Sequence, residues 1–253
     1  MKILEANDLC KRFGGVEAIS HLDFCLNDGE ILGLIGPNGA GKTTLFNLLS
    51  GVYVPSGGEV IYKSRNLVGL KPHEITKLGI ARTFQKIRLF QKLPVIKNVL
   101  IAQHCRVEPK LWNIFETKKN RITEERYRKK AVEILSFLGL EERESDLAMD
   151  LPYGTQKIVE IARALGTEPD ILLLDEPAAG LNNTESEELM ALVSRIRDQG
   201  ISVIIIEHDM DVIMGISDRI VVLNYGKKIF EGGPSETQKD DGVRVAYLGE
   251  EIE

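Results

Sequence analysis

The sequence has few cysteines, no long apolar segment and no excess of basic residues. Its three cysteines, Cys10, Cys25 and Cys105, are widely spaced and odd in number. This arrangement argues against a disulfide framework and against a CxxC zinc motif, and it favours reduced thiols in a cytosolic protein. The N-terminal segment contains acidic side chains and no apolar run, so we expect no secretory signal peptide.

No stretch approaches the ~20 apolar residues that a membrane helix requires, so a role at a membrane would depend on partner proteins. Acidic residues outnumber basic ones by 38 to 32, which gives a net charge of −6. General nucleic-acid binders usually carry a basic excess, and we therefore expect no nucleic-acid partner. The chain has 253 residues, 43% of them hydrophobic and 28% charged, as is typical of a globular protein.

Three short apolar runs, at residues 31–35, 171–174 and 203–206, are each typical of a buried β-strand. A helix is predicted between the last two runs, because Thr184 and Glu187 form a capping-box pattern. Its apolar residues recur at helical spacing: Leu189, Leu192, Val193 and Ile196. Apolar strands that alternate with amphipathic helices predict a largely parallel sheet with helices on both faces.

The middle of the chain has a different pattern, with little strand character and much helical periodicity. We interpret residues 86–156 as a helical lobe inserted into an α/β core formed by residues 1–85 and 157–253, the whole being one domain. Within the lobe, residues 106–130 are rich in charges of both signs. A solvated helical face is the favoured interpretation of this stretch, over a surface that faces lipid or a permease.

Residues 36–43, GPNGAGKT, match the pattern G-x-x-x-x-G-K-[ST] between a predicted strand and a predicted helix. Glycines let backbone N–H groups crowd around a phosphate chain, and a helix N-terminus adds a positive dipole end. Lys42 would contact the β- and γ-phosphates, and the Thr43 hydroxyl would face Mg²⁺. The predicted nucleotide-binding residues are Gly36, Pro37, Asn38, Gly39, Ala40, Gly41, Lys42, Thr43 and Thr44.

Two acids, Asp175 and Glu176, follow the second apolar run, and a strand end in an open α/β sheet faces the ligand crevice. Asp175 is placed to hold Mg²⁺, and Glu176 could orient or deprotonate an attacking water. Many strands end in solvated acids, so the phosphate loop upstream strengthens this interpretation. His208 follows the third run, where it could contact a γ-phosphate or be a hydrogen-bonded turn residue.

In this order, the motifs resemble the ATP-binding subunits of ABC transporters over nearly the whole chain. Phe13 matches the aromatic residue that stacks on adenine in that family. Gln85, within ARTFQ, matches the glutamine that joins Mg²⁺ and the nucleophilic water to the membrane-facing lobe. Residues 151–156, LPYGTQ, match the signature motif, whose common form is LSGGQ. AAGLN, at 178–182, matches the loop after the catalytic carboxylate, and His208 matches the switch histidine.

The resemblance implies a P-loop NTPase fold with an N-terminal antiparallel β subdomain and an inserted helical lobe, with ATP and Mg²⁺ as cofactors. It implies catalytic roles for Glu176, His208 and Gln85. It implies magnesium ligands at Thr43, Gln85 and Asp175, and contacts to a facing subunit's ATP from Leu151, Gly154 and Gln156. Two such subunits, identical or different, would pair head to tail, and the helical lobe would pass their motion to two membrane permeases.

Several segments resemble more specifically the larger ATPase of Liv-type branched-chain amino-acid importers. They are IARTFQKIRLF at 80–90, VIKNVLIAQH at 95–104 and VRVAYLGEE at 243–251. The resemblance implies a peripheral protein on the cytoplasmic face of the inner membrane, served indirectly by a periplasmic solute-binding protein. ATPases for urea or amide import and for lipopolysaccharide export share parts of the pattern, so another solute is one alternative and a soluble ABC switch protein is a second.

Pro152 departs from the signature motif, which usually has serine at this position. Proline has neither a hydroxyl nor a backbone N–H to offer a phosphate. Losing one phosphate hydrogen bond costs roughly 1–3 kcal/mol, and we therefore expect this chain to complete its partner's ATP site poorly. Thr155 and Asn183 are milder departures from the family pattern.

Overall fold

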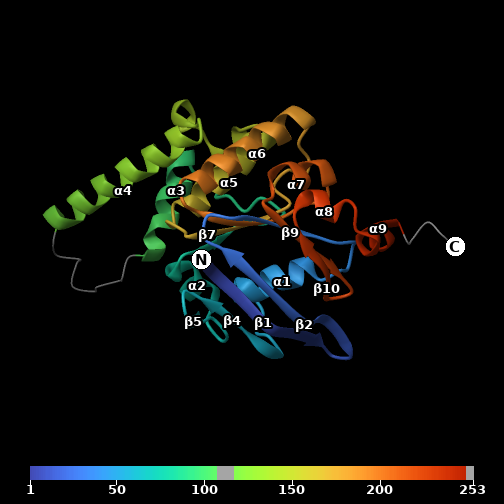
Figure 1. The fold of residues 1–253 in the computed structure, drawn as a ribbon. Helices are drawn as coiled ribbons and strands as arrows, with labels where there is room; N and C mark the ends of the chain where they lie inside the picture. The colour runs from blue at the N-terminus through green and yellow to red at the C-terminus, as the bar shows by residue number, and fades with distance from the viewer. Residues whose placement is uncertain (107–116, 249–253) are drawn as a thin grey trace.

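The computed structural model describes residues 1–106 and 117–248, which form two sheets with helices packed around them (Figure 1). The larger sheet has six strands in the order β10-β9-β3-β8-β7-β6. Five of them are parallel, and only β10 is antiparallel to its neighbour. Their bounds are β3 Ile31–Ile35, β6 Ile80–Arg82, β7 Ile171–Asp175, β8 Ser202–Ile206, β9 Arg219–Asn224 and β10 Lys227–Gly232.

The three predicted apolar runs are the central strands β3, β7 and β8, and every residue in them is buried. Strands that are covered on both faces need apolar side chains on both sides. This explains why apolar and polar residues do not alternate in these segments. The parallel arrangement brings the carboxyl ends of β3, β7 and β8 to one edge of the sheet. The α/β fold predicted from the sequence is confirmed.

A second, antiparallel sheet lies at the N-terminal side, in the order β2-β1-β4-β5. Its strands are β1 Lys2–Phe13, β2 Val16–Asn27, β4 Gly57–Tyr62 and β5 Arg65–Asn66. Helix α1, Lys42–Leu49, lies between the two sheets, and its residues Leu45, Phe46 and Leu49 belong to the core that both sheets share (Figure 1). This sheet matches the antiparallel β subdomain expected from the family resemblance.

The opposite face of the larger sheet is covered by helices α5 Tyr153–Leu165, α6 Asn183–Asp198 and α7 Met210–Ile216. The predicted apolar face of α6 is buried, but the predicted cap is wrong. The N-cap is Asn182, whose side chain accepts a hydrogen bond from the backbone of Glu185 in a reciprocal capping box. Thr184 and Glu187 lie inside the helix, because the earlier box begins the helix two residues sooner.

Between β6 and β7 the described residues carry α3 Val95–Gln103, α4 Thr117–Phe137 and α5, with no strand longer than one bridge. Helix α4 projects away from the sheets at one side of the molecule (Figure 1). The predicted boundary after residue 156 falls inside α5, so the signature segment and the first core helix are one rigid element. Much of the charged stretch 106–130 lies outside the described residues, as does the end of the segment 243–251.

The remaining elements are short. They are α2 Pro72–Leu78, α8 Pro234–Thr237 and α9 Asp241–Leu248, with 3-10 turns at His104–Arg106, Glu141–Arg143 and Ala148–Asp150. Among the described residues, no helix combines the length and the apolar character that crossing a bilayer requires.

Candidate nucleotide site

The phosphate loop connects the end of β3 to the start of α1, as its sequence pattern predicts. Gly36 and Gly41 adopt φ angles of 149° and 105°. A Cβ on Gly36 would come within 2.1 Å of the Leu223 carbonyl oxygen, and one on Gly41 within 2.7 Å of the Ala18 carbonyl oxygen. Both positions therefore require glycine for conformational and for steric reasons.

A cavity of about 350 Å³ opens above this loop. Its lining comes from the loop and the start of α1, from β2, and from the residues that follow β6, β7 and β8: Ala18, Asn38, Gly39, Ala40, Gly41, Lys42, Thr43, Thr44, Gln85, Glu176 and His208. Most of the residues predicted to bind nucleotide or to act in catalysis therefore meet at one place, although they are spread over much of the chain. Backbone N–H groups and a helix N-terminus at such a place suit a phosphate chain.

Lys42 is buried, and its ammonium donates hydrogen bonds to the carbonyl oxygens of Gly36 at 2.5 Å and Pro37 at 3.1 Å. Burial lowers the pKa of Lys42, while the nearby carboxylates of Glu176 and Asp175 raise it. The ammonium thus lies within the loop that would surround the phosphates. The ammonium could donate to a phosphate oxygen in place of one of these carbonyl oxygens, with no change in the fold.

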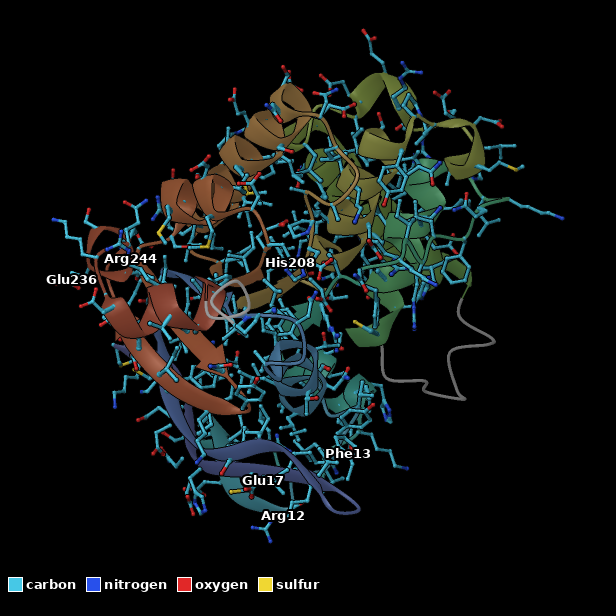
Figure 2. The ribbon with its side chains drawn as sticks, turned by 90° about the vertical axis from the view of Figure 1, so that its right-hand side faces the viewer. Arg12, Phe13, Glu17, His208, Glu236 and Arg244 are labelled. Carbon is cyan, nitrogen blue, oxygen red and sulfur yellow. The ribbon has the colours of Figure 1, made fainter. Side chains whose placement is uncertain are left out.

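Glu176 is the centre of a three-residue hydrogen-bond cluster. The Gln85 amide nitrogen donates to Glu176 Oε2 at 2.8 Å, and His208 Nε2 lies 2.7 Å from Glu176 Oε1. Figure 2 shows His208 near the middle of the molecule, where the two lobes meet. Glu176 also has φ of 50°, an uncommon conformation for a non-glycine residue that recurs at functional sites. The geometry thus favours a site role for His208 over that of a turn residue.

Asp175 is buried at the end of β7 and makes a salt bridge with Arg82, with 2.8 Å between Oδ2 and Nη2. The same guanidinium donates to Asn47 Oδ1 at 2.7 Å and to Ser50 Oγ at 3.1 Å on and beside α1. Arg82 therefore joins the carboxylate strand to the helix that follows the phosphate loop. Sequence reasoning missed it, because one cation at a strand end has no distinguishing spacing.

Phe13 lies apart from this cavity, near the tip of the β1–β2 hairpin, as Figure 2 shows, and it is 42% exposed. Its ring packs edge-on against Tyr53 at 5.1 Å, and Lys11 Nζ lies 4.9 Å from the Phe13 ring centre. An exposed aromatic pair with a neighbouring cation is a suitable platform for a base. Tyr53 and Lys11 were not predicted, since neither belongs to a motif.

The signature segment is separate from the cavity within this chain. Pro152 is the N-cap of α5 and makes no side-chain capping bond, and Leu151 is buried beneath it. Gln156 donates to the Leu151 carbonyl oxygen at 2.9 Å. A Cβ on Gly154 would contact the side chain of Leu181, in the loop 178–182, at 3.4 Å. The structure therefore does not bring Leu151, Gly154 and Gln156 to this chain's own phosphate loop.

Two buried ionisable residues that were not predicted contact the loops that carry the Gln85–Glu176–His208 cluster. Lys157 Nζ lies 3.4 Å from the Gln85 carbonyl oxygen and 3.3 Å from that of Glu176. Glu207 accepts a hydrogen bond from the Ala178 amide at 2.7 Å, and burial raises the pKa of the Glu207 carboxyl. Lys157 follows the signature segment directly, so one side chain contacts both catalytic loops from the signature helix.

The C-terminal helix also reaches the phosphate loop. Burial raises the pKa of Tyr247, on α9, to about 12, and the backbone of Gly36 partly offsets this shift. The phenol is therefore neutral at physiological pH and can donate or accept a hydrogen bond there.

Comparison with known proteins gives a consistent result. A family model described as "ABC transporter" matches residues 19–179. The high-affinity branched-chain amino acid transport ATP-binding protein LivG of Salmonella typhimurium is 44% identical over 250 residues, which cover 98% of each chain. BraF of Pseudomonas aeruginosa, described in the same words, is 41% identical with the same coverage.

Among solved structures, the ADP conformation of the ATP-binding cassette MJ1267 superposes with a TM-score of 0.87 at 33% identity, covering 98% of this chain and 99% of the other. The dimeric cassette MJ0796 has a TM-score of 0.76 at 27% identity, covering 91% and 98%. Both likenesses extend over nearly all of the described fold.

Proposed function

The chain belongs to the ABC transporter family, and from that premise we propose that it is the ATP-hydrolysing subunit of an importer for branched-chain amino acids. Hydrolysis rests on one observation above all, the placement of Glu176 between Gln85 and His208 at the rim of the phosphate-loop cavity. The substrate class rests on LivG and BraF, which are similar to this chain along its whole length.

In this proposal, ATP lies with its phosphates in the loop, and Lys42 and the loop amides bind the β- and γ-phosphate oxygens. The Glu176 carboxylate orients a water molecule and takes its proton as the water oxygen bonds to the γ-phosphorus. The bond from that phosphorus to the bridging oxygen breaks, and ADP and phosphate leave. His208 is placed to hold Glu176 and to contact the γ-phosphate.

The donor atoms at the cavity also fit a magnesium ion. A hydroxyl from Thr43, a carboxylate oxygen from Asp175 and an amide oxygen from Gln85 make the all-oxygen set that Mg²⁺ prefers. The Gln85 amide nitrogen already donates to Glu176, so its oxygen remains available, and Arg82 occupies only one oxygen of Asp175. When bound, the ion would offset negative charge on the β- and γ-phosphates.

We further propose that two subunits pair so that the segment 151–156 of each covers ATP on the other. The separation of this segment from the chain's own phosphate loop supports this, since the site within one chain is open on that side. Helix α5 and its Lys157 connect the signature segment to the loops that carry Gln85 and Glu176. A partner that contacts the signature segment could in this way affect hydrolysis.

An exposed apolar patch supports docking on membrane permeases. Phe90, Leu147 and Met149 are 47%, 38% and 51% exposed. Backbone hydrogen bonds from Ala148 to Leu93 and from Met149 to Gln91 hold the two segments side by side. Within the patch, Phe90 follows Gln85 closely in sequence, so a permease that binds there would contact the catalytic cluster through a short loop. The protein would then lie peripherally on the cytoplasmic face of the membrane.

Affinity purification of the tagged chain from gently solubilised host membranes tests this proposal. We expect two hydrophobic permeases and a second, similar ATPase by mass spectrometry, and loss of leucine, isoleucine and valine uptake when the gene is deleted. The double variant F90S/M149S should lose the permeases, while V68S, at an exposed apolar residue away from the patch, should keep them. Lipid-export components, or only soluble partners, would contradict the importer assignment.

A further inference from the structure

A cluster of three metal-ligating side chains lies on the N-terminal sheet, outside the nucleotide site. Asp8 and Cys10 come from β1, and His21 comes from the neighbouring strand β2. One ligand atom from each, the Asp8 carboxylate oxygen, Cys10 Sγ and a His21 ring nitrogen, lies within 4.8 Å of the other two. None of the three lines the phosphate-loop cavity or takes part in the proposed hydrolysis.

The backbone turns these side chains toward one another. Asp8 and His21 have φ angles of 49° and 47°, in the left-handed region that non-glycine residues seldom adopt. The β1–β2 register shifts between Ala6 and Leu9, next to Asp8. Bulges of this kind redirect a side chain and are enriched beside functional sites. In the described chain, five further non-glycine residues share this uncommon conformation, and Glu176 at the nucleotide site is one of them.

Hydrogen bonds hold the two strained residues in place. The Asp8 amide donates to Asp23 Oδ1 at 2.7 Å, and the His21 amide donates to Cys10 Sγ at 3.3 Å. The second bond is directed at the sulfur, so it fixes the position of Cys10 Sγ relative to the strand that carries His21. His21 Nδ1 lies 2.5 Å from Asp8 Oδ1, so the imidazole and the carboxylate already face each other across the two strands.

The ligand set selects the class of ion. Thiolate, imidazole and carboxylate together suit Zn²⁺ and similar borderline dications rather than Mg²⁺ or Ca²⁺. Zinc bonds of about 2.0–2.3 Å place tetrahedral ligand atoms roughly 3.3–3.8 Å apart. The present separations, 2.5 Å between Asp8 and His21 and at most 4.8 Å within the set, reach that range through side-chain rotation.

Burial also fits an ion that enters from solvent. Cys10 is only 7% exposed, whereas the side chains of Asp8 and His21 are each 69% exposed. The thiolate would form the floor of the site, the two exposed ligands would close over the ion, and water would complete the coordination. We propose that Asp8, Cys10 and His21 form a binding site for Zn²⁺ or a similar dication, which links strands β1 and β2.

Cobalt titration of the full chain without nucleotide tests this proposal, because a cobalt–thiolate bond gives a charge-transfer band in the near ultraviolet. The variant C25S/C105S keeps Cys10 as the sole thiol, and it should bind one Co²⁺ per chain with that band and release it to Zn²⁺. Metal binding should also raise its thermal unfolding midpoint. In that background, H21A and D8N should each weaken the metal at least tenfold, since each removes one of three ligands.

H73A removes an exposed histidine on α2 and serves as the matched control, which should bind metal like its parent. Because Asp8 and His21 are exposed, their variants are expected to stay folded, and circular dichroism without metal checks this. Absence of the band from C25S/C105S would overturn the proposal. Equal metal affinity in H21A, D8N and H73A would overturn it as well, since the thiol would then bind metal without the other two side chains.

Discussion

Replacing Arg82 by methionine tests how strongly the buried ion pair supports the nucleotide site. Arg82 and Asp175 have side chains that are 8% and 5% exposed, and their charged atoms lie 2.8 Å apart. The guanidinium also packs over the rings of Phe46 and Phe84. Methionine keeps much of this apolar contact but leaves the Asp175 carboxylate buried without its cation. Breaking a buried pair in this way costs about 3–5 kcal/mol.

Urea unfolding followed by far-ultraviolet circular dichroism measures this effect. With a slope of about 3 kcal/mol per molar urea, the expected loss moves the midpoint down by roughly 1–2 M. R82M/D175N should recover part of the loss, since a neutral asparagine avoids an unpaired buried charge. R143M, which breaks an exposed pair with Asp146, should change stability by less than about 1 kcal/mol.

Two results would refute this reasoning. If R82M lost less than about 1 kcal/mol, desolvation of the pair would already cancel its attraction. If the effects of R82M and D175N were simply additive, Arg82 would act through its packing and its bonds to Asn47 and Ser50 rather than through Asp175.

Three further predictions concern the signature segment and the residues that support the catalytic cluster. P152S should stabilise the isolated chain by about 0.5–2 kcal/mol, because serine can cap α5 where proline cannot; it should also raise turnover in the assembled transporter, and unchanged turnover would contradict a weakened partner site. K157M should lower ATP turnover about tenfold with little loss of ATP affinity, since one to two charged hydrogen bonds to the catalytic loops are removed; unaltered steady-state kinetics would disprove that role. Because burial raises the pKa of Glu207, the folded state holds this proton more tightly than the unfolded state, and the resulting stability is lost as pH rises through the folded pKa. E207Q does not titrate there, so its stability relative to the native chain should increase as pH rises from the usual range of a glutamate through the raised pKa of Glu207, and a pH-independent difference in thermal midpoint would contradict this.

The position of the phosphate loop between β3 and α1 could be predicted because its sequence pattern is local. All of its residues lie between one strand and one helix, so spacing alone specifies the turn and the helix N-terminus. The strands β3, β7 and β8 could also be predicted, because a continuous apolar run is stable only when both of its faces are buried. The parallel order then explains why Glu176 and His208, at the ends of β7 and β8, meet.

The bonds that hold the cluster could not be read from the sequence. Gln85 and Glu176 are 91 residues apart, and their contact depends on β6 pairing with β7. Lys157 and Arg82 have no motif of their own, and a lone cation in a helix or strand is usually solvated. Asn182–Glu185 satisfies the same capping-box pattern as the predicted Thr184–Glu187, and the structure begins α6 at the earlier box.

The N-terminal strands were expected only from the family resemblance. β1 and β2 are 12 residues each, but register shifts interrupt their alternation of buried and exposed residues. A period of two is the signal that identifies a half-buried strand, and the bulges remove it. The same bulges create the Asp8–Cys10–His21 cluster, so the feature that hid the strands also formed the proposed metal site.

The account depends most on Glu176 as the residue that activates water. Replacing it by glutamine keeps the shape, and the amide oxygen can still accept the hydrogen bond from Gln85, while the base is removed. E176Q should bind ATP with native affinity and lose at least a hundredfold in turnover. E187Q, at an exposed acid on α6, should keep native turnover. Near-native hydrolysis by E176Q would contradict the central claim, because another group would then have to activate the water.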